Sequence, residues 1–144
     1  MEQGFDASAL VDALGLIAEN EARFTERFYE LFFELRPDTR PLFGRYSISE
    51  QEEMMRETLR SLHALSEGED WLNENLAALG ASHEEYGVTT DMYPSYVEAM
   101  IACAEEVLGE AFGEDAMRAI RTALDDVTST MAQAGSDSAG TAKS

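Results

Sequence analysis

Apolar residues recur along this chain at steps of three and four, and this spacing appears in every long segment. It is clear in residues 72–88, where Leu72, Leu76, Leu79 and Tyr86 follow one another in this register. Residues spaced in this way lie on one face of an α-helix. The sequence contains neither the alternating apolar and polar runs of strands nor the Asn-Gly and Asp-Gly pairs of tight hairpins. The pattern therefore predicts an all-α protein.

Breaks in the pattern divide the chain into helices of unequal length. Pro37 and Pro41 interrupt it after the second helix and predict a short irregular corner. Because of this corner and the unequal lengths, a simple four-helix bundle is a poor description. We expect helices over residues 6–20, 21–35, 47–66 and 71–87, one that begins near Pro94, and a last one after Gly113.

The length of 144 residues predicts one domain, which we place at residues 1–133. Residues 134–144 are small and polar, which favours a disordered tail. The single Cys103 excludes an internal disulfide framework and favours a reducing compartment. The first residues lack the pattern of a signal peptide, and no apolar stretch reaches the roughly 18–20 residues that a membrane span requires. We therefore expect a cytoplasmic protein.

The charge is strongly negative, with 29 acidic and 10 basic residues and a net charge of −19. Nucleic acid is not an expected partner, because phosphate contacts need clustered Lys and Arg. Anionic membranes would repel such a chain as well. The acidic residues are spread along the whole sequence, which favours a salt-rich, halophilic-like cytoplasm over one basic partner. A basic partner is the alternative interpretation.

His83 lies on the apolar stripe of residues 72–88, in register with Leu76, Leu79 and Tyr86. An imidazole in that position is either a core histidine with a hydrogen-bonded partner or a metal ligand. The other histidine, His63, has no comparable place and is interpreted as a surface or rim residue.

Two stretches of the chain resemble a known family. Residues 28–43, FYELFFELRPDTRPLF, are similar to the second helix and corner of bacterial globins, and residues 83–94, HEEYGVTTDMYP, are similar to their haem-ligand segment. The resemblance runs from about Phe24 to Met131 and is to single-domain bacterial haemoglobins and the globin half of flavohaemoglobins. It implies a globin-like fold of six to eight helices around a haem pocket, haem b as cofactor, and reversible binding of dioxygen, nitric oxide or other small gases.

On the proximal side, the resemblance implies that His83 is the iron ligand and that Val88 and Tyr93 also contact the haem. Iron in haem accepts a neutral imidazole as its axial ligand. The partners of the propionates are open, with Arg45 as one neighbour to consider.

On the distal side, the resemblance implies four contacts. Tyr29 would donate its hydroxyl to dioxygen at the iron, Gln51 would be a second polar group, Met55 an apolar lid, and Phe43 would stack on the porphyrin. Each has an ordinary alternative: Tyr29 and Gln51 as polar surface residues, and Phe43 and Met55 as plain core packing.

The chain departs from the flavohaemoglobin pattern. Gly135 stands near the position of a glutamate late in the last helix, and Ile120 and Leu124 replace an aromatic pair. No reductase domain and no dinucleotide fingerprint are present. Nitric oxide dioxygenase activity would therefore need an external reductase, and no catalytic residue is assigned. A haem-based gas sensor and a haem-free globin-like regulatory or interaction module are the alternatives, and a homodimer is left open.

Overall fold

The computed structural model describes residues 6–43 and 47–143, with side chains over 6–43 and 48–134. These parts of the chain contain α-helices and short 3₁₀ helices and no strand, which confirms the predicted all-α class. In chain order the helices are α1 (Ala7–Glu19), α2 (Glu21–Leu35), η1 (Pro37–Phe43), α3 (Ser47–Glu67), α4 (Leu72–Glu85), α5 (Met92–Leu108), η2 (Gly109–Ala111) and α6 (Glu114–Lys143).

The helix ends follow from local chemistry. The Asp6 carboxylate accepts hydrogen bonds from the backbone N–H groups of Ser8 and Ala9, at 3.0 and 3.2 Å, and so caps α1. Pro94 lies in the first turn of α5, where the N–H group that it lacks has no partner within the helix. Gly87, with φ of +101°, stands just beyond the end of α4 in a backbone conformation that other residues rarely adopt.

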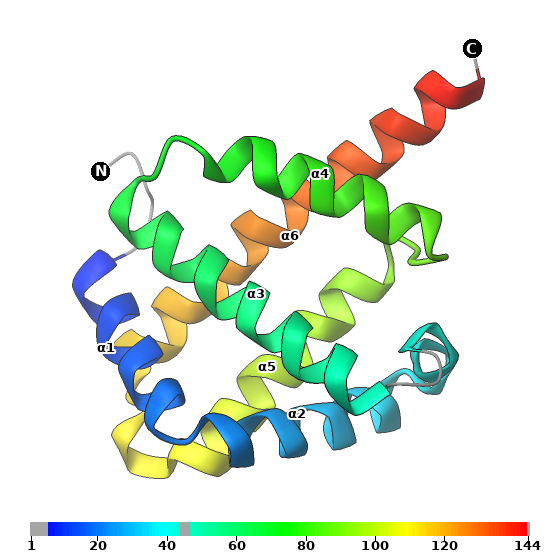
Figure 1. Ribbon diagram of the computed structural model, residues 1–144. Helices are drawn as coiled ribbons and strands as arrows, with labels where there is room; N and C mark the ends of the chain where they lie inside the picture. The colour runs from blue at the N-terminus through cyan, green and yellow to red at the C-terminus, as the bar shows by residue number, and fades with distance from the viewer. Residues whose placement is uncertain (1–5, 44–46, 144) are drawn as a thin grey trace.

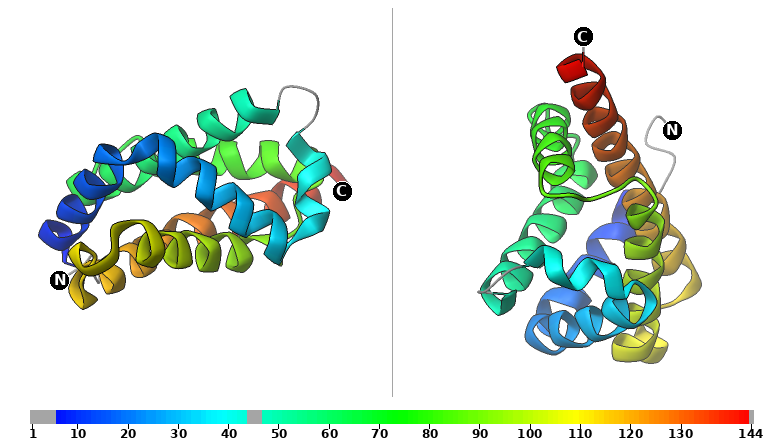
Figure 2. Two further views of the ribbon diagram at one scale, coloured as in Figure 1. Left: turned by 90° about the horizontal axis from the view of Figure 1, so that it is seen from below. Right: turned by 90° about the vertical axis from the view of Figure 1, so that its right-hand side faces the viewer.

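The helices pack as crossing pairs (Figure 1). The most extensive contacts join α4 to α6 and α2 to α5. Seen from below and from the side, α3 lies on the opposite side of the molecule from α5 and α6 (Figure 2). Within the described residues, no helix has the length and apolarity to cross a membrane.

The C-terminal part of α6 projects beyond the other helices (Figure 1). Its backbone is helical through Lys143, over a stretch whose composition predicts disorder. That expectation about residues 134–144 remains a prediction.

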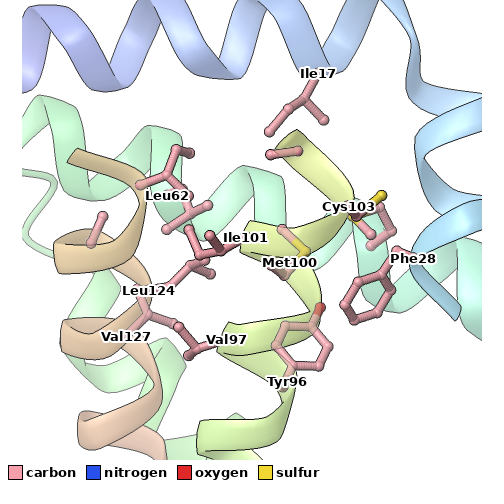
Figure 3. Packing of buried hydrophobic residues seen from close by; sticks show 14 of the residues in the cluster. Ile17, Phe28, Leu62, Tyr96, Val97, Met100, Ile101, Cys103, Leu124 and Val127 are labelled. Carbon is pink, nitrogen blue, oxygen red and sulfur yellow. The ribbon is translucent and has the colours of Figure 1, made fainter. Parts of the chain in front are cut away.

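The core gathers around α5 (Figure 3). Val97, Met100 and Ile101 of this helix are buried, as are Phe28 of α2 and Leu124 of α6. Fully burying a side chain of this size contributes about 1.5–3 kcal/mol. The buried cluster therefore joins elements from both halves of the chain and fixes α5 between α2 and α6.

One contact brings two backbones unusually close. A β-carbon built on Gly80 of α4 would lie 2.2 Å from the carbonyl oxygen of Met131 in α6. No residue with a side chain fits there unless the helices separate. Gly80 therefore sets how closely α4 packs on α6.

Candidate functional site

A cavity of about 530 Å³ lies among α2, η1, α3, α4, α5 and α6. This volume is within the range of about 300–1,000 Å³ that small-molecule and cofactor sites occupy. The lining is largely apolar and aromatic, with hydroxyl groups and one imidazole among it. The apolar wall includes Phe32, Leu42, Phe43, Met54, Leu79, Val88, Met92, Leu124, Val127 and Met131.

His83 supplies the imidazole of this wall. Its Nδ1 lies 2.6 Å from the carbonyl oxygen of Leu79, one turn earlier in α4. A carbonyl oxygen only accepts hydrogen bonds, so Nδ1 carries the proton and donates it. Burial lowers the pKa of His83, although the hydrogen bond to Leu79 opposes that shift. The ring is therefore held neutral, with the lone pair on Nε2 available to a ligand.

The helix around His83 is held on both sides. Three residues before it, Gly80 contacts the backbone of Met131. Four residues after it, Gly87 has the positive φ that follows the helix end. The position of the imidazole is thus fixed by packing against α6 and by a defined end to α4.

Phe43, Val88 and Tyr93, which the sequence analysis assigned to the site, line the same cavity as His83. Phe43 is brought there by η1, and its ring meets that of Tyr29 at 5.4 Å in an edge-to-face arrangement. Tyr93 is partly buried, and burial raises the pKa of its phenol. The structure therefore brings residues of the corner and of the segment after α4 to one wall.

Tyr29 lies behind this wall and is not among the residues that line the cavity. It is 2% exposed, and its hydroxyl oxygen has no hydrogen-bond partner within the described part of the chain. Burial raises the pKa of Tyr29, so its hydroxyl keeps its proton. An unpaired buried hydroxyl costs about 1–3 kcal/mol. Tyr29 therefore offers an unused hydrogen-bond donor next to Phe43.

The face that α3 turns to the cavity is offset by one residue from the expected one. Glu50 and Met54 line the cavity, whereas Gln51 and Met55 do not. Met55 is fully buried in the core instead. The resemblance assigned Gln51 and Met55, and residues 68–71, where α3 has ended and α4 has not begun, separate them from His83. Because this connection is not helical, the sequence spacing across it does not determine which face of α3 is turned toward the cavity.

Sequence reasoning also missed a pair of hydroxyl groups in the wall. Tyr96 of α5 and Thr58 of α3 both line the cavity, and their hydroxyl oxygens lie 2.6 Å apart. Tyr96 shares the helical register of Met100 and Cys103, which would have indicated that it is buried. No signal in the sequence indicated its pairing with Thr58.

The edge of the cavity along α3 is acidic. Glu50, Glu53 and Glu57 belong to the lining, and no Lys or Arg does so among the described residues. Arg56, the nearest base in sequence, pairs with Glu53 at 3.1 Å on the surface. Arg45, considered above for the propionates, lies outside the described residues.

Comparison with known families and proteins gives consistent matches. The family model described as Globin matches residues 26–131. An uncharacterised globin-like protein of Aquifex aeolicus (strain VF5) is 28% identical over 116 residues, which cover 81% of each chain.

Two solved structures share the fold. A bacterial globin from Campylobacter jejuni superposes with a TM-score of 0.74 at 18% identity, over 94% of this chain and 96% of its own. A flavohaemoglobin from Malassezia yamatoensis, solved with bound FAD and haem, superposes with a TM-score of 0.78 at 17% identity. The match covers 91% of this chain but only 36% of the flavohaemoglobin.

Proposed function

This chain belongs to the globin family, and on that premise we propose that its cavity binds haem b through His83 and that the protein binds dioxygen reversibly. The observation that carries the proposal is the imidazole of His83, which is hydrogen-bonded to Leu79 on the wall of a cavity of about 530 Å³. That hydrogen bond selects the tautomer whose Nε2 can ligate iron and orients the ring.

The apolar walls of the cavity and its one imidazole fit the ring and the iron of this group. The planar porphyrin of haem needs apolar and aromatic walls, which Phe43, Val88 and Met92 supply. The buried hydroxyl of Tyr29 has no partner within the described part of the chain. A small polar ligand beside Phe43 would give it one. When bound, the haem supplies an iron with one coordination position open to a gas.

The side chains of this protein would bind the haem and set the environment of its gas ligand. His83 would hold the cofactor, and its hydrogen bond to Leu79 would raise the basicity of the imidazole as a ligand. The unpaired hydroxyl of Tyr29, which lies next to Phe43 of the lining, would donate a hydrogen bond to a dioxygen ligand that reached it. Phe32, Met54 and Leu124 add apolar surface to the lining, which disfavours water beside them. A hydrogen bond formed among such residues would be stronger than one in water.

The biological role that we propose is storage or delivery of oxygen, or removal of nitric oxide with the help of an external reductase, in the cytoplasm. Dioxygen and nitric oxide are the expected small partners. An oxygen carrier and a nitric oxide dioxygenase differ in turnover. The dioxygenase would form nitrate from nitric oxide faster than the protein with bound dioxygen autoxidises. Purified protein with an added reductase, tested for nitrate formation, separates them.

The test of haem binding is uptake by the purified protein. We expect a Soret band with added haem that is lost in His83→Ala. His63→Ala is the matched control, because that imidazole is 56% exposed and lies beside Glu67 on the surface. A protein that takes up no haem would contradict the proposal and leave a haem-free globin-like module. A His83→Ala variant with an unchanged spectrum would show that the haem is bound without His83, which contradicts the proposal as well.

A further inference from the structure

The hydroxyl groups of Tyr96 and Thr58 join α5 to α3 at the wall of the cavity. Their oxygens lie 2.6 Å apart, and both residues belong to the lining. The ring of Tyr96 is fixed by edge-to-face contacts with Phe28 and Phe32, at 4.8 and 5.5 Å between centroids. Figure 3 shows Tyr96 beside Phe28 on the inner face of α5. The tyrosine oxygen is therefore held in place by three neighbours.

The second hydrogen bond of Thr58 determines where the protons lie. Thr58 Oγ1 is also 3.0 Å from the backbone carbonyl oxygen of Met54, one turn earlier in α3. A threonine hydroxyl has one proton. If Thr58 donates to Met54, Tyr96 must donate to Thr58, and the tyrosine then has only lone pairs left for a third group.

The opposite arrangement of the two hydroxyl protons has a similar free energy. If Thr58 instead donates to Tyr96, the tyrosine proton is free for another acceptor. The Met54 carbonyl then loses the hydroxyl but stays within the regular hydrogen bonding of α3, which runs without a break from Ser47 to Glu67. The two arrangements differ by the rotation of two hydroxyl groups and by one neutral hydrogen bond, a net contribution of modest size.

We propose that Tyr96 is a ligand-contacting residue whose hydroxyl donates a hydrogen bond to the diatomic ligand of the pocket, and that Thr58 is a positioning residue that can switch this donor on. The inference rests on the haem-binding function proposed above. It assigns to α5 a polar contact with the ligand, which the sequence resemblance assigns to Tyr29 of α2 and Gln51 of α3. Of the two tyrosines, Tyr96 is the one that lines the cavity.

Two substitutions test the pair, and their effects should have opposite signs. Tyr96→Phe removes the donor while keeping the ring, and we expect dioxygen to dissociate about tenfold faster. Thr58→Val keeps the shape of threonine but removes its competing hydroxyl. The tyrosine proton is then left for the ligand alone, and dissociation should slow about threefold to fivefold. Thr58→Ser retains the hydroxyl and is the matched control, with a rate near that of the unchanged protein.

A spectroscopic measurement accompanies the rates. In the carbon monoxide complex, the C–O stretching frequency reports the hydrogen-bonding groups around the ligand, and we expect Tyr96→Phe and Thr58→Val to shift it in opposite directions. If both variants leave the rate and frequency unchanged, the inference is overturned. If both accelerate dissociation, the pair acts only as packing, and the inference is overturned as well.

Failure of this inference is distinguishable from failure of the proposed function. A protein that shows no Soret band with haem fails the proposed function, and the inference falls with it. A protein with a His83-dependent Soret band whose ligand is insensitive to Tyr96 and Thr58 keeps the proposed function and loses only the inference.

Discussion

Gly80 of α4 lies against the carbonyl group of Met131 in α6, so closely that a β-carbon on Gly80 would stand 2.2 Å from that oxygen. The contact is between two backbones, so neither side can yield by rotating a side chain. It lies one turn before His83 on the same helix. The packing of α4 on α6 and the position of the imidazole are therefore coupled.

The first prediction concerns this contact. Gly80→Ala forces the two helices apart, and we expect the free energy of unfolding to fall by about 1–3 kcal/mol or more, with faster loss of haem. Gly15→Ala is the matched control. It also lies within a helix, but a β-carbon there meets nothing within 4 Å, so alanine should stabilise α1 by about 0.5–1 kcal/mol. Urea denaturation measures both, and equal effects from the two variants would show that the close contact is not formed.

The second prediction concerns Tyr29. Because its buried hydroxyl has no partner among the described residues, Tyr29→Phe should stabilise the haem-free protein by about 1 kcal/mol. In the haem-loaded protein the same variant should release dioxygen about 10- to 100-fold faster, because a hydrogen bond to a charged group is lost. Thermal melting of the haem-free form and stopped-flow dissociation give the two readings. An unchanged dissociation rate would show that Tyr29 does not reach the ligand.

The third prediction concerns the ion pair at the start of η1. Arg36 donates to both carboxylate oxygens of Asp38, at 3.0 and 2.7 Å, and to the backbone carbonyl of Asp91 at 2.9 Å. The hydrogen bonds from Arg36 hold the pKa of Asp38 below its ordinary value. Since the pKa is lower in the folded state, this stabilisation is present above about pH 4 and is lost as the pH falls through the folded value.

Arg36→Gln should therefore lower stability at pH 6 more than at pH 2 to 3, and should move the Asp38 pKa back toward its ordinary value. Carboxyl chemical shifts and urea midpoints across this pH range measure the two effects. Arg118→Gln, which removes an exposed arginine at the start of α6, is the control. A loss of stability in Arg36→Gln that is the same at every pH would contradict the assignment.

The fourth prediction concerns the net charge of −19. Repulsion among the acidic residues destabilises the compact state, and added salt screens it over about 10 Å at 0.1 M and 3 Å at 1 M. We expect the melting temperature to rise steadily with potassium chloride from 0.01 to 1 M. A melting temperature that falls or stays constant over this range would exclude a halophilic-like surface.

Much of the fold could be predicted from local sequence. The second helix, Glu21–Leu35, has the expected bounds because its apolar spacing, and the proline that follows it at position 37, are properties of neighbouring residues. The fifth begins at Met92, two residues before Pro94, because a proline is accommodated throughout the first turn. The family resemblance extended these local patterns to the whole globin fold.

The details of the site depend on packing between distant segments and could not be predicted in the same way. Which face of α3 meets the cavity is set by its neighbours, and Glu50 and Met54 line the cavity whereas Gln51 and Met55 do not. The contact between Thr58 and Tyr96 joins residues 38 positions apart. From the sequence, Gly80 would be expected to destabilise its helix. In the structure, the absence of a side chain at Gly80 lets α4 approach the backbone of Met131.

The acidic edge formed by Glu50, Glu53 and Glu57 would affect which small molecules enter the cavity. An approaching anion such as nitrite, azide or superoxide meets unfavourable Coulomb energy there, whereas dioxygen, nitric oxide and carbon monoxide carry no charge and pass unaffected. The acidic edge would thus discriminate by charge among small molecules that approach along α3, before any interior group discriminates by shape. Added salt would weaken this discrimination for the anions alone.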